Sequence, residues 1–145
     1  MARVAVIEKT GGPEVIQWAG RDLPPPGPGE VRMRQTAVGL NFIDTYHRSG
    51  LYPVPLPSGL GSEAAGVVEA VGEGVTAFAV GDRVATYGPG LGAYASERNV
   101  PAEILSKLPD AIADEVAAAG MLKGRTAGYL VERANILDRL FYSLQ

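Results

Sequence analysis

The side chains best suited to chemistry lie close together in this chain, between Asn41 and Tyr52. The stretch carries an amide at Asn41, a carboxylate at Asp44, phenols at Tyr46 and Tyr52, and the imidazole of His47. All of these groups donate or accept hydrogen bonds, and an imidazole also binds metals. The stretch therefore offers hydrogen bonds to a bound molecule or part of a metal site, and composition decides between the two.

Composition argues against a metal site. The chain has no cysteine, and its only histidine is His47. A catalytic zinc normally takes three protein ligands and a structural zinc four, mostly from Cys and His. We therefore predict no metal, and we expect His47 to be an exposed helix residue. The lack of cysteine also excludes disulfides and favours a reducing compartment.

The stretch 59–75 is the central segment of the predicted fold, and the other elements are placed relative to it. Residues 64–71 are rich in small and β-branched side chains and are bracketed by glycines, which predicts a strand. Gly72 and Gly74 then predict a turn, because glycine reaches positive φ without a steric clash. The small residues at 64–66 would let another backbone segment or a ligand approach closely.

The polar stretch is expected to follow a neighbouring strand. Residues 31–38 alternate apolar and polar, which predicts a strand with one wet face. Residues 43–49 predict a two-turn helix that ends at Gly50, and a proline-held loop at 51–57 leads back to the central stretch. The candidate side chains therefore belong to this helix and its loop.

The remaining chain predicts a turn-rich β domain with helices at its end. Strands are predicted at residues 3–8, 15–18, 83–87 and 93–98, while 101–110 reads as irregular. Alanine-rich residues 114–121 predict a helix, and a second helix is predicted beyond Gly124. That second helix carries an apolar stripe formed by Leu130, Ala134, Leu137, Phe141 and Leu144.

Composition also bounds the class of protein. With 145 residues, 46% of them hydrophobic, the chain is long enough for one domain with its own core. A net charge of −3 with scattered cations argues against nucleic acid as a partner. No apolar run has the length of a signal peptide or of a membrane span. The expected location is cytoplasmic.

Several ordered motifs resemble one family. They are AVGLNFIDTY at 37–46, RSGLYP at 48–53, GLGSEAAG at 59–66, GDRV at 81–84, AAA at 117–119, LKG at 122–124 and TA at 126–127. Residues 1–130 resemble the N-terminal half of the zinc-free, zeta-crystallin-like quinone oxidoreductases of the medium-chain dehydrogenase/reductase superfamily. The resemblance implies a mainly β fold with short helices, a GroES-like partly open β-barrel. It also implies NADPH as hydride donor and a quinone or conjugated carbonyl as acceptor.

The resemblance also implies roles for particular residues. Zinc-dependent relatives have Cys near the position of Asn41 and His in a Gly-His-Glu motif, which reads Gly61-Ser62-Glu63 here. Without a metal, hydrogen-bond donors must polarise the substrate carbonyl. The family then suggests catalytic roles for Asn41, Tyr46 and Tyr52. For Asn41 the ordinary alternative is a helix cap, and for each tyrosine a half-buried ring with a wet hydroxyl.

Four residues are the candidates for cofactor contact: Asn41, Asp44, Lys123 and Thr126. Asp44 is explained equally well as a charge at a helix N-terminus, and Lys123 and Thr126 as a solvated lysine and a helix-start threonine. Glu63 is expected to be a structural carboxylate that accepts hydrogen bonds beneath the cleft, with general acid as the alternative.

The chain departs from the family after about residue 130. No Gly-x-Gly-x-x-Gly turn follows a strand, so the Rossmann domain that would hold the cofactor pyrophosphate is expected to be absent. We predict a GroES-like catalytic domain at 1–125 and a C-terminal helical segment at 126–145 in place of the entry to that domain.

Two functions from different classes remain open. The first is the substrate-side domain of an NADPH-dependent quinone reductase, inactive or nearly so by itself. The second is a non-catalytic GroES-like module that self-associates, with a homodimer formed through Leu130, Leu137, Phe141 and Leu144.

Overall fold

The computed structural model describes residues 1–88 and 90–132. Within these ranges the chain forms eight strands, two α-helices and two short 3-10 helices. In chain order they are β1 (Ala2–Ile7), η1 (Pro13–Val15), β2 (Ile16–Arg21), β3 (Glu30–Gly39), α1 (Phe42–Ser49), β4 (Ser58–Gly59), β5 (Glu63–Val71), β6 (Arg83–Tyr87), β7 (Glu97–Pro101), η2 (Ala102–Ile104), β8 (Leu105–Lys107) and α2 (Asp114–Glu132).

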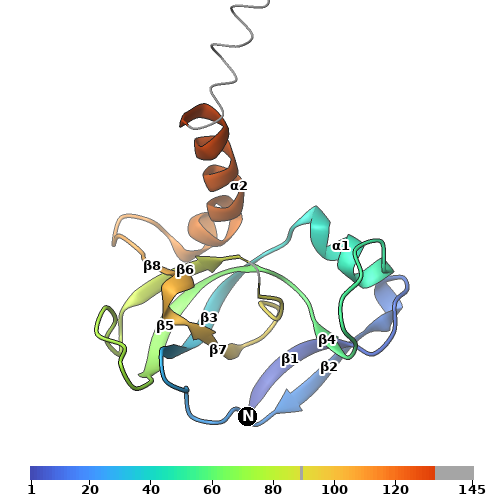
Figure 1. The fold of residues 1–145 in the computed structure, drawn as a ribbon, viewed down its shortest axis with the longest axis horizontal. Coiled ribbons are helices and arrows are strands. Elements are labelled where there is room, and N and C mark those ends of the chain that lie inside the picture. The colour runs from blue at the N-terminus through green and yellow to red at the C-terminus, as the bar shows by residue number, and fades with distance from the viewer. Residues whose placement is uncertain (89, 133–145) are drawn as a thin grey trace, which may run out of the picture.

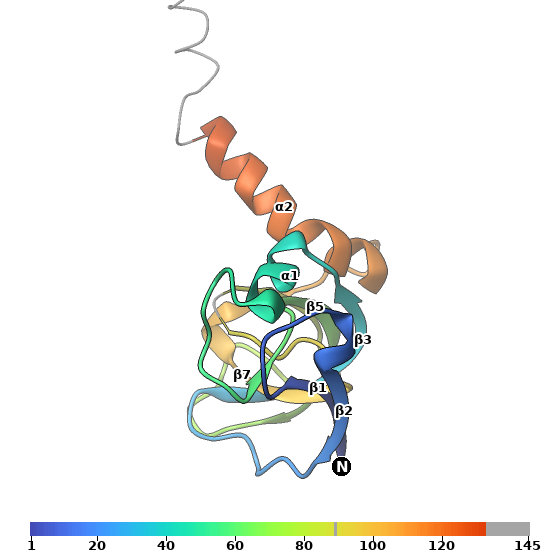
Figure 2. The ribbon, with the colours of Figure 1, turned by 90° about the vertical axis from the view of Figure 1, so that its right-hand side faces the viewer.

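The strands form two antiparallel sheets that curve around a common interior. The larger sheet has the order β7-β3-β5-β6-β8, and the smaller has the order β2-β1-β4. The segment before β7 joins them, since Val4 of β1 forms a bridge with Ala95. Figures 1 and 2 show α1 and α2 lying outside this β body. The sheets do not close into one barrel, so the predicted mainly β, partly open architecture is confirmed.

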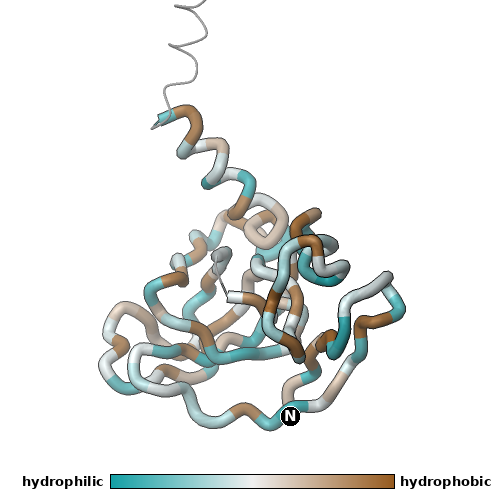
Figure 3. Tube along the Cα trace, turned by 45° about the vertical axis from the view of Figure 1, so that its right-hand side comes forward, coloured by the Kyte–Doolittle hydropathy of each residue, from teal (hydrophilic) through white to brown (hydrophobic). Residues whose placement is uncertain are grey.

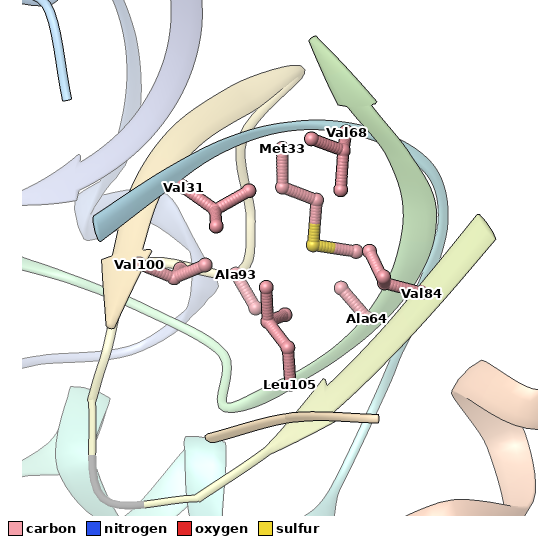
Figure 4. Packing of buried hydrophobic residues seen from close by; sticks show 8 residues of the cluster. All are labelled: Val31, Met33, Ala64, Val68, Val84, Ala93, Val100 and Leu105. Atoms are coloured by element: carbon pink, nitrogen blue, oxygen red, sulfur yellow. The ribbon is translucent and has the colours of Figure 1, made fainter. Parts of the chain in front are cut away.

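The core follows from the alternation predicted for residues 31–38. Val31 and Met33 are fully buried and point into the large sheet's concave face, where Val68, Val84 and Val100 surround them (Figure 4). Arg34 and Thr36 on the opposite face are exposed. Side chains alternate across a strand, so the apolar set is inside and the charged set outside.

Small residues bring α2 onto the large sheet. Ala117 and Ala118 of α2 pack against Ala65 and Ala85 of β5 and β6. A Cβ added at Gly39 would lie 2.1 Å from the backbone oxygen of Ala118, so only glycine permits this approach. Of the small residues predicted to allow a close approach, Ala65 therefore serves the packing of α2, while Ala64 belongs to the interior core and Gly66 lies against the β3 backbone.

Polar bonds fix the first turn of α2 to the sheet. Arg83 of β6 forms an ion pair with Asp114 at 2.5 Å and also donates to the carbonyl of Ile112. The hydroxyl of Thr36 on β3 donates to the same aspartate. The Thr36 hydrogen bond, followed by the bond from Arg83, lowers the pKa of Asp114. The helix thus begins at a defined point above β3 and β6.

One predicted strand was wrong in its bounds, and one strand was missed in a stretch predicted to be irregular. The strand expected at 93–98 forms only at Glu97–Pro101, because Ser96 donates its N–H to Arg3 of β1 before the chain moves to β3. The stretch 101–110 contains β8, which pairs with β6. That strand has a single buried residue, Leu105, so the sequence shows no alternating pattern that would predict it.

The prediction of a second helix beyond Gly124 was also wrong, because α2 continues through Gly124 to Glu132 without a break. Figure 1 shows its latter part projecting from the β body. The predicted boundary at 125/126 lies inside this helix and stays a prediction. Of the predicted dimer stripe, Leu130 is 41% exposed, while Leu137, Phe141 and Leu144 lie outside the described residues.

Candidate functional site

The site is built around the first turn of α1. Asn41 is the N-cap of this helix, and its backbone N–H donates to the carboxylate of Asp44 at 2.9 Å. Gly50 ends the helix in the left-handed conformation, with φ of 85°, as predicted. The N–H of Asp44 in turn donates to the backbone carbonyl of Asn41 at 3.0 Å.

The Asn41 side chain joins a buried polar network. Its Nδ2 donates to Glu63 Oε2 at 2.8 Å, and its Oδ1 accepts from Lys123 Nζ at 2.8 Å. Glu63 is fully buried and also accepts from the backbone N–H of Leu122 at 2.7 Å. The Lys123 ammonium lies 3.6 Å from Glu63. The carboxylate therefore ties the start of α1 to the middle of α2, and the prediction that it accepts hydrogen bonds here is confirmed.

A hollow of about 510 Å³ opens beside this network. The end of β3, residues 36–40, forms one wall, and α2 forms the other through Ala118, Ala119 and Lys123. Leu40 is 77% exposed, and the Lys123 side chain is 57% exposed. The hollow thus combines apolar surface with one ammonium, Lys123, and one carboxylate, Glu115.

Tyr46 and Tyr52 form an aromatic cluster on the other side of Asn41. Their ring centroids are 5.2 Å apart, and Phe42 meets Tyr46 edge-on, also at 5.2 Å. Tyr52 is 49% exposed. His47 lies 6.3 Å from the Tyr52 ring and is half-buried with its Nδ1 enclosed, so its predicted exposure was wrong. Packing against Tyr52 covers the imidazole.

Sequence reasoning missed Tyr94. Its hydroxyl donates to Asp44 at 2.8 Å, and burial, followed by that hydrogen bond, raises the pKa of its phenol above the ordinary value. The ring lies where a Cβ on Gly61 would be, 2.3 Å from its Cδ1. Gly61 also has φ of 82°, so both the space taken by the Tyr94 ring and the backbone conformation require glycine at this position. The only sequence signal was the glycine itself.

The structure brings some of the predicted residues together and separates another. Asn41 and Lys123 are in contact, Asp44 supports Asn41 through its backbone, and the two tyrosines flank the same helix. Thr126 instead donates its hydroxyl to the Leu122 carbonyl within α2. The functional roles of all six residues stay predictions.

A family comparison fits this arrangement. The alcohol dehydrogenase GroES-like domain family matches residues 27–110, which include β3, α1, β5 and β6. The chain belongs to this family.

Similar relatives include reductases. The chain is 56% identical over 134 residues to a quinone oxidoreductase of Pseudomonas aeruginosa, and the aligned region covers 92% of this chain and 41% of that protein. It is 53% identical to a 2-haloacrylate reductase of a Burkholderia species, covering 93% of this chain and 42% of the relative. The crystal structure of Escherichia coli quinone oxidoreductase complexed with NADPH superimposes with a TM-score of 0.88 at 48% identity, over 92% of this chain and 41% of that one.

The chain therefore spans about two fifths of the length of the relatives that it matches. The Escherichia coli quinone oxidoreductase was solved as a complex with NADPH. Separately, none of the helices in the described part of the chain is both long and apolar enough to cross a membrane.

Proposed function

We propose that this chain is the substrate-side domain of an NADPH-dependent reductase that acts on quinones or other conjugated carbonyls and uses no zinc. The observation that carries the proposal is the network in which Asn41, Glu63 and Lys123 meet at a hollow. By the family resemblance, the amide of Asn41 stands near the position of a cysteine in zinc-dependent relatives, and hydrogen bonds orient both of its polar atoms.

The hollow suits the nicotinamide end of the cofactor. Leu40 and Ala119 offer apolar surface to a ring, and the Lys123 ammonium offers a charge to a phosphate or a donor to the carboxamide. Asn41 and Lys123 would hold this end of NADPH. Asp44 is only 4% exposed and would act by holding Asn41 in place. A contact from Thr126 remains part of the proposal. When bound, NADPH supplies a hydride to the acceptor.

The chain's own residues then handle the charge that develops on the acceptor oxygen. The Asn41 amide has two Nδ2 hydrogens, and Glu63 takes one of them. The second is available for the acceptor oxygen, and the carboxylate behind it polarises the amide and keeps it from rotating. Tyr46 and Tyr52 form an aromatic wall whose phenols provide further donors, because no side-chain partner within the described residues takes their hydroxyls.

A chimera tests this proposal. Residues 1–124 of this chain would replace the matching part of the Pseudomonas aeruginosa quinone oxidoreductase, and NADPH oxidation with a small quinone would be followed by absorbance. We expect the chimera to turn over, Asn41→Ala to lower kcat by about 10²-fold or more, and the exposed control Glu69→Gln to change nothing. A folded chimera that oxidises no NADPH with quinones or enones would refute the proposal.

One observation favours the second candidate, a self-associating module. Tyr129, Leu130 and Val131 are 63%, 41% and 61% exposed on the part of α2 that projects from the body. Figure 3 shows apolar segments recurring along this helix. We propose a second copy as their partner. Light scattering would give a dimer mass that falls to a monomer in Leu130→Glu, and a monomeric wild type would exclude it.

A further inference from the structure

Arg98 on β7 is a cation on the inner face of the large sheet. The register pairs it with Met33 of β3, a fully buried core residue, and it shares a strand face with buried Val100. Since side chains two apart in a strand lie on one face, Arg98 points toward the interior, as Val100 does in Figure 4. Neither the fold nor the proposed reductase site needs a charge at this position.

The guanidinium of Arg98 lacks a counter-charge within residues 1–88 and 90–132. Its Nε is buried without a hydrogen-bond partner, and none of the ion pairs among these residues includes it. Burial alone lowers the pKa of Arg98 to about 10. An arginine at this pKa is still charged at neutral pH, and buried charges in proteins are normally paired.

Arg98 lines a hollow of about 460 Å³ between the two sheets. The walls are mainly small or apolar: Val4 and Ala5 of β1, Gly59 of β4 and Ile104 of η2. A hollow of this volume is large enough for a small organic molecule rather than only a water molecule.

Three carboxylates and a second cation, Arg21, also line the hollow, but none of the carboxylates forms an ion pair with Arg98. Glu97 is the adjacent residue on β7, so its side chain leaves the opposite face. Glu30 already accepts a hydrogen bond from the Gly27 N–H at 2.9 Å. Asp22 is an exposed residue at the rim. Arg98 therefore lines the hollow without a carboxylate partner among the described residues.

We propose that this hollow is a binding site for a small oxyanion, a carboxylate or a phosphate group, which Arg98 holds. The planar guanidinium presents paired N–H donors that match two oxygens of such a group. Arg98 beside apolar side chains suits a small organic acid or a phosphate monoester, whose oxyanion would pair with Arg98 while the remainder contacts Val4 and Ile104. The site is separate from the Asn41 network, and the inference does not depend on the proposed reductase activity.

Thermal unfolding of the 145-residue chain tests the site. Acetate, inorganic phosphate and chloride would be compared at constant ionic strength and pH 7. At ten times its Kd, a ligand of the native state raises the Tm by about 5 °C. We expect such a rise with acetate or phosphate and none with chloride, and the effective anion identifies the class. In the same titration, the buried Nε–H signal of Arg98 in a ¹⁵N-arginine spectrum should shift and saturate.

Two variants make the test specific. Arg98→Met should remove the anion-dependent rise while leaving the Tm in chloride unchanged or higher, because it removes an unpaired buried charge. Arg34→Met is the control, since Arg34 is half exposed and paired with Glu69, and it should keep the full rise. Equal Tm values of the wild type in all three salts, or a rise that persists in Arg98→Met, would overturn the proposal. The wild-type titration decides the matter even where Arg98→Met fails to fold.

Discussion

Replacing Glu63 with Gln would test the network that joins α1 to α2. The carboxylate is fully buried and accepts from two donors, Asn41 Nδ2 and the Leu122 backbone N–H. Glutamine offers only one acceptor oxygen, and its amide nitrogen would face the other donor. One buried N–H would then lose its partner, which costs about 2–3 kcal/mol with the loss of a charge-assisted bond. For a chain of this size that lowers the Tm by about 8–12 °C.

Urea unfolding followed by circular dichroism would measure this loss for Glu63→Gln beside a matched variant, Lys123→Met. The lysine side chain is 57% exposed, so its 3.6 Å ion pair with Glu63 is screened by solvent, and together with its hydrogen bond to Asn41 Oδ1 it should contribute about 1 kcal/mol. We therefore expect the glutamine variant to lose at least twice as much stability as the methionine variant. Equal losses, or a glutamine variant within about 0.5 kcal/mol of wild type, would refute the reasoning, because surface substitutions usually fall in that range.

Three further predictions concern the supports of the site. Asp114→Asn should cost about 1 kcal/mol at pH 7. Because the pKa of Asp114 is lowered in the folded protein, the stability that Asp114 contributes is complete above its ordinary pKa of 3.8 and is lost as pH falls through the folded pKa. The variant lacks this titration, so its stability should fall less steeply than that of the wild type at acid pH. Tyr94→Phe removes a donor from buried Asp44 and should cost about 1–2 kcal/mol in urea unfolding. Gly39→Ala forces a Cβ toward the Ala118 carbonyl and should cost about 1–3 kcal/mol, with weaker protection of α2 amides in hydrogen exchange.

Each of these predictions has a control or an opposing result. Gly120→Ala has open space around its Cβ inside α2 and should stabilise the protein by up to about 1 kcal/mol. If both glycine variants lose the same stability, close packing is not the reason at Gly39. A stability profile of Asp114→Asn that parallels the wild type down to pH 2, or an unchanged unfolding midpoint for Tyr94→Phe, would contradict the other two.

Local patterns were enough to predict most of the β body. The alternation at 31–38 identified the inward residues Val31 and Met33, and the glycines around 64–71 identified the central strand. The pattern failed where one segment serves two partners, as at 93–98, and where a strand buries a single residue, as at Leu105. It also failed at Gly124, because a glycine costs a helix only about 1 kcal/mol and does not end it without a competing cap.

The site was predictable in its residues but not in its connections. Helix-cap chemistry and the family motifs pointed to Asn41, Asp44 and Lys123, and the structure gathers them. The bond from Leu122 N–H to Glu63 joins positions 59 residues apart, and the bond from Tyr94 to Asp44 joins positions 50 residues apart. A backbone N–H donor is the same in every residue type except proline, so the sequence does not mark Leu122 as the donor. The inward position of Arg98 could not be predicted either, because an arginine in a strand normally faces solvent.

A titration of ¹⁵N-labelled chain with NADPH, followed by two-dimensional NMR, tests the central claim most directly. With contacts only to the nicotinamide end, we expect weak binding, a Kd of about 1 mM or above. The saturating shifts should fall on residues 38–41 and 118–123 and should disappear in Asn41→Ala, whereas Glu69→Gln keeps them. Shifts that saturate elsewhere on the surface, or no shifts at 10 mM NADPH, about ten times that Kd, would contradict the assignment of this hollow to the cofactor.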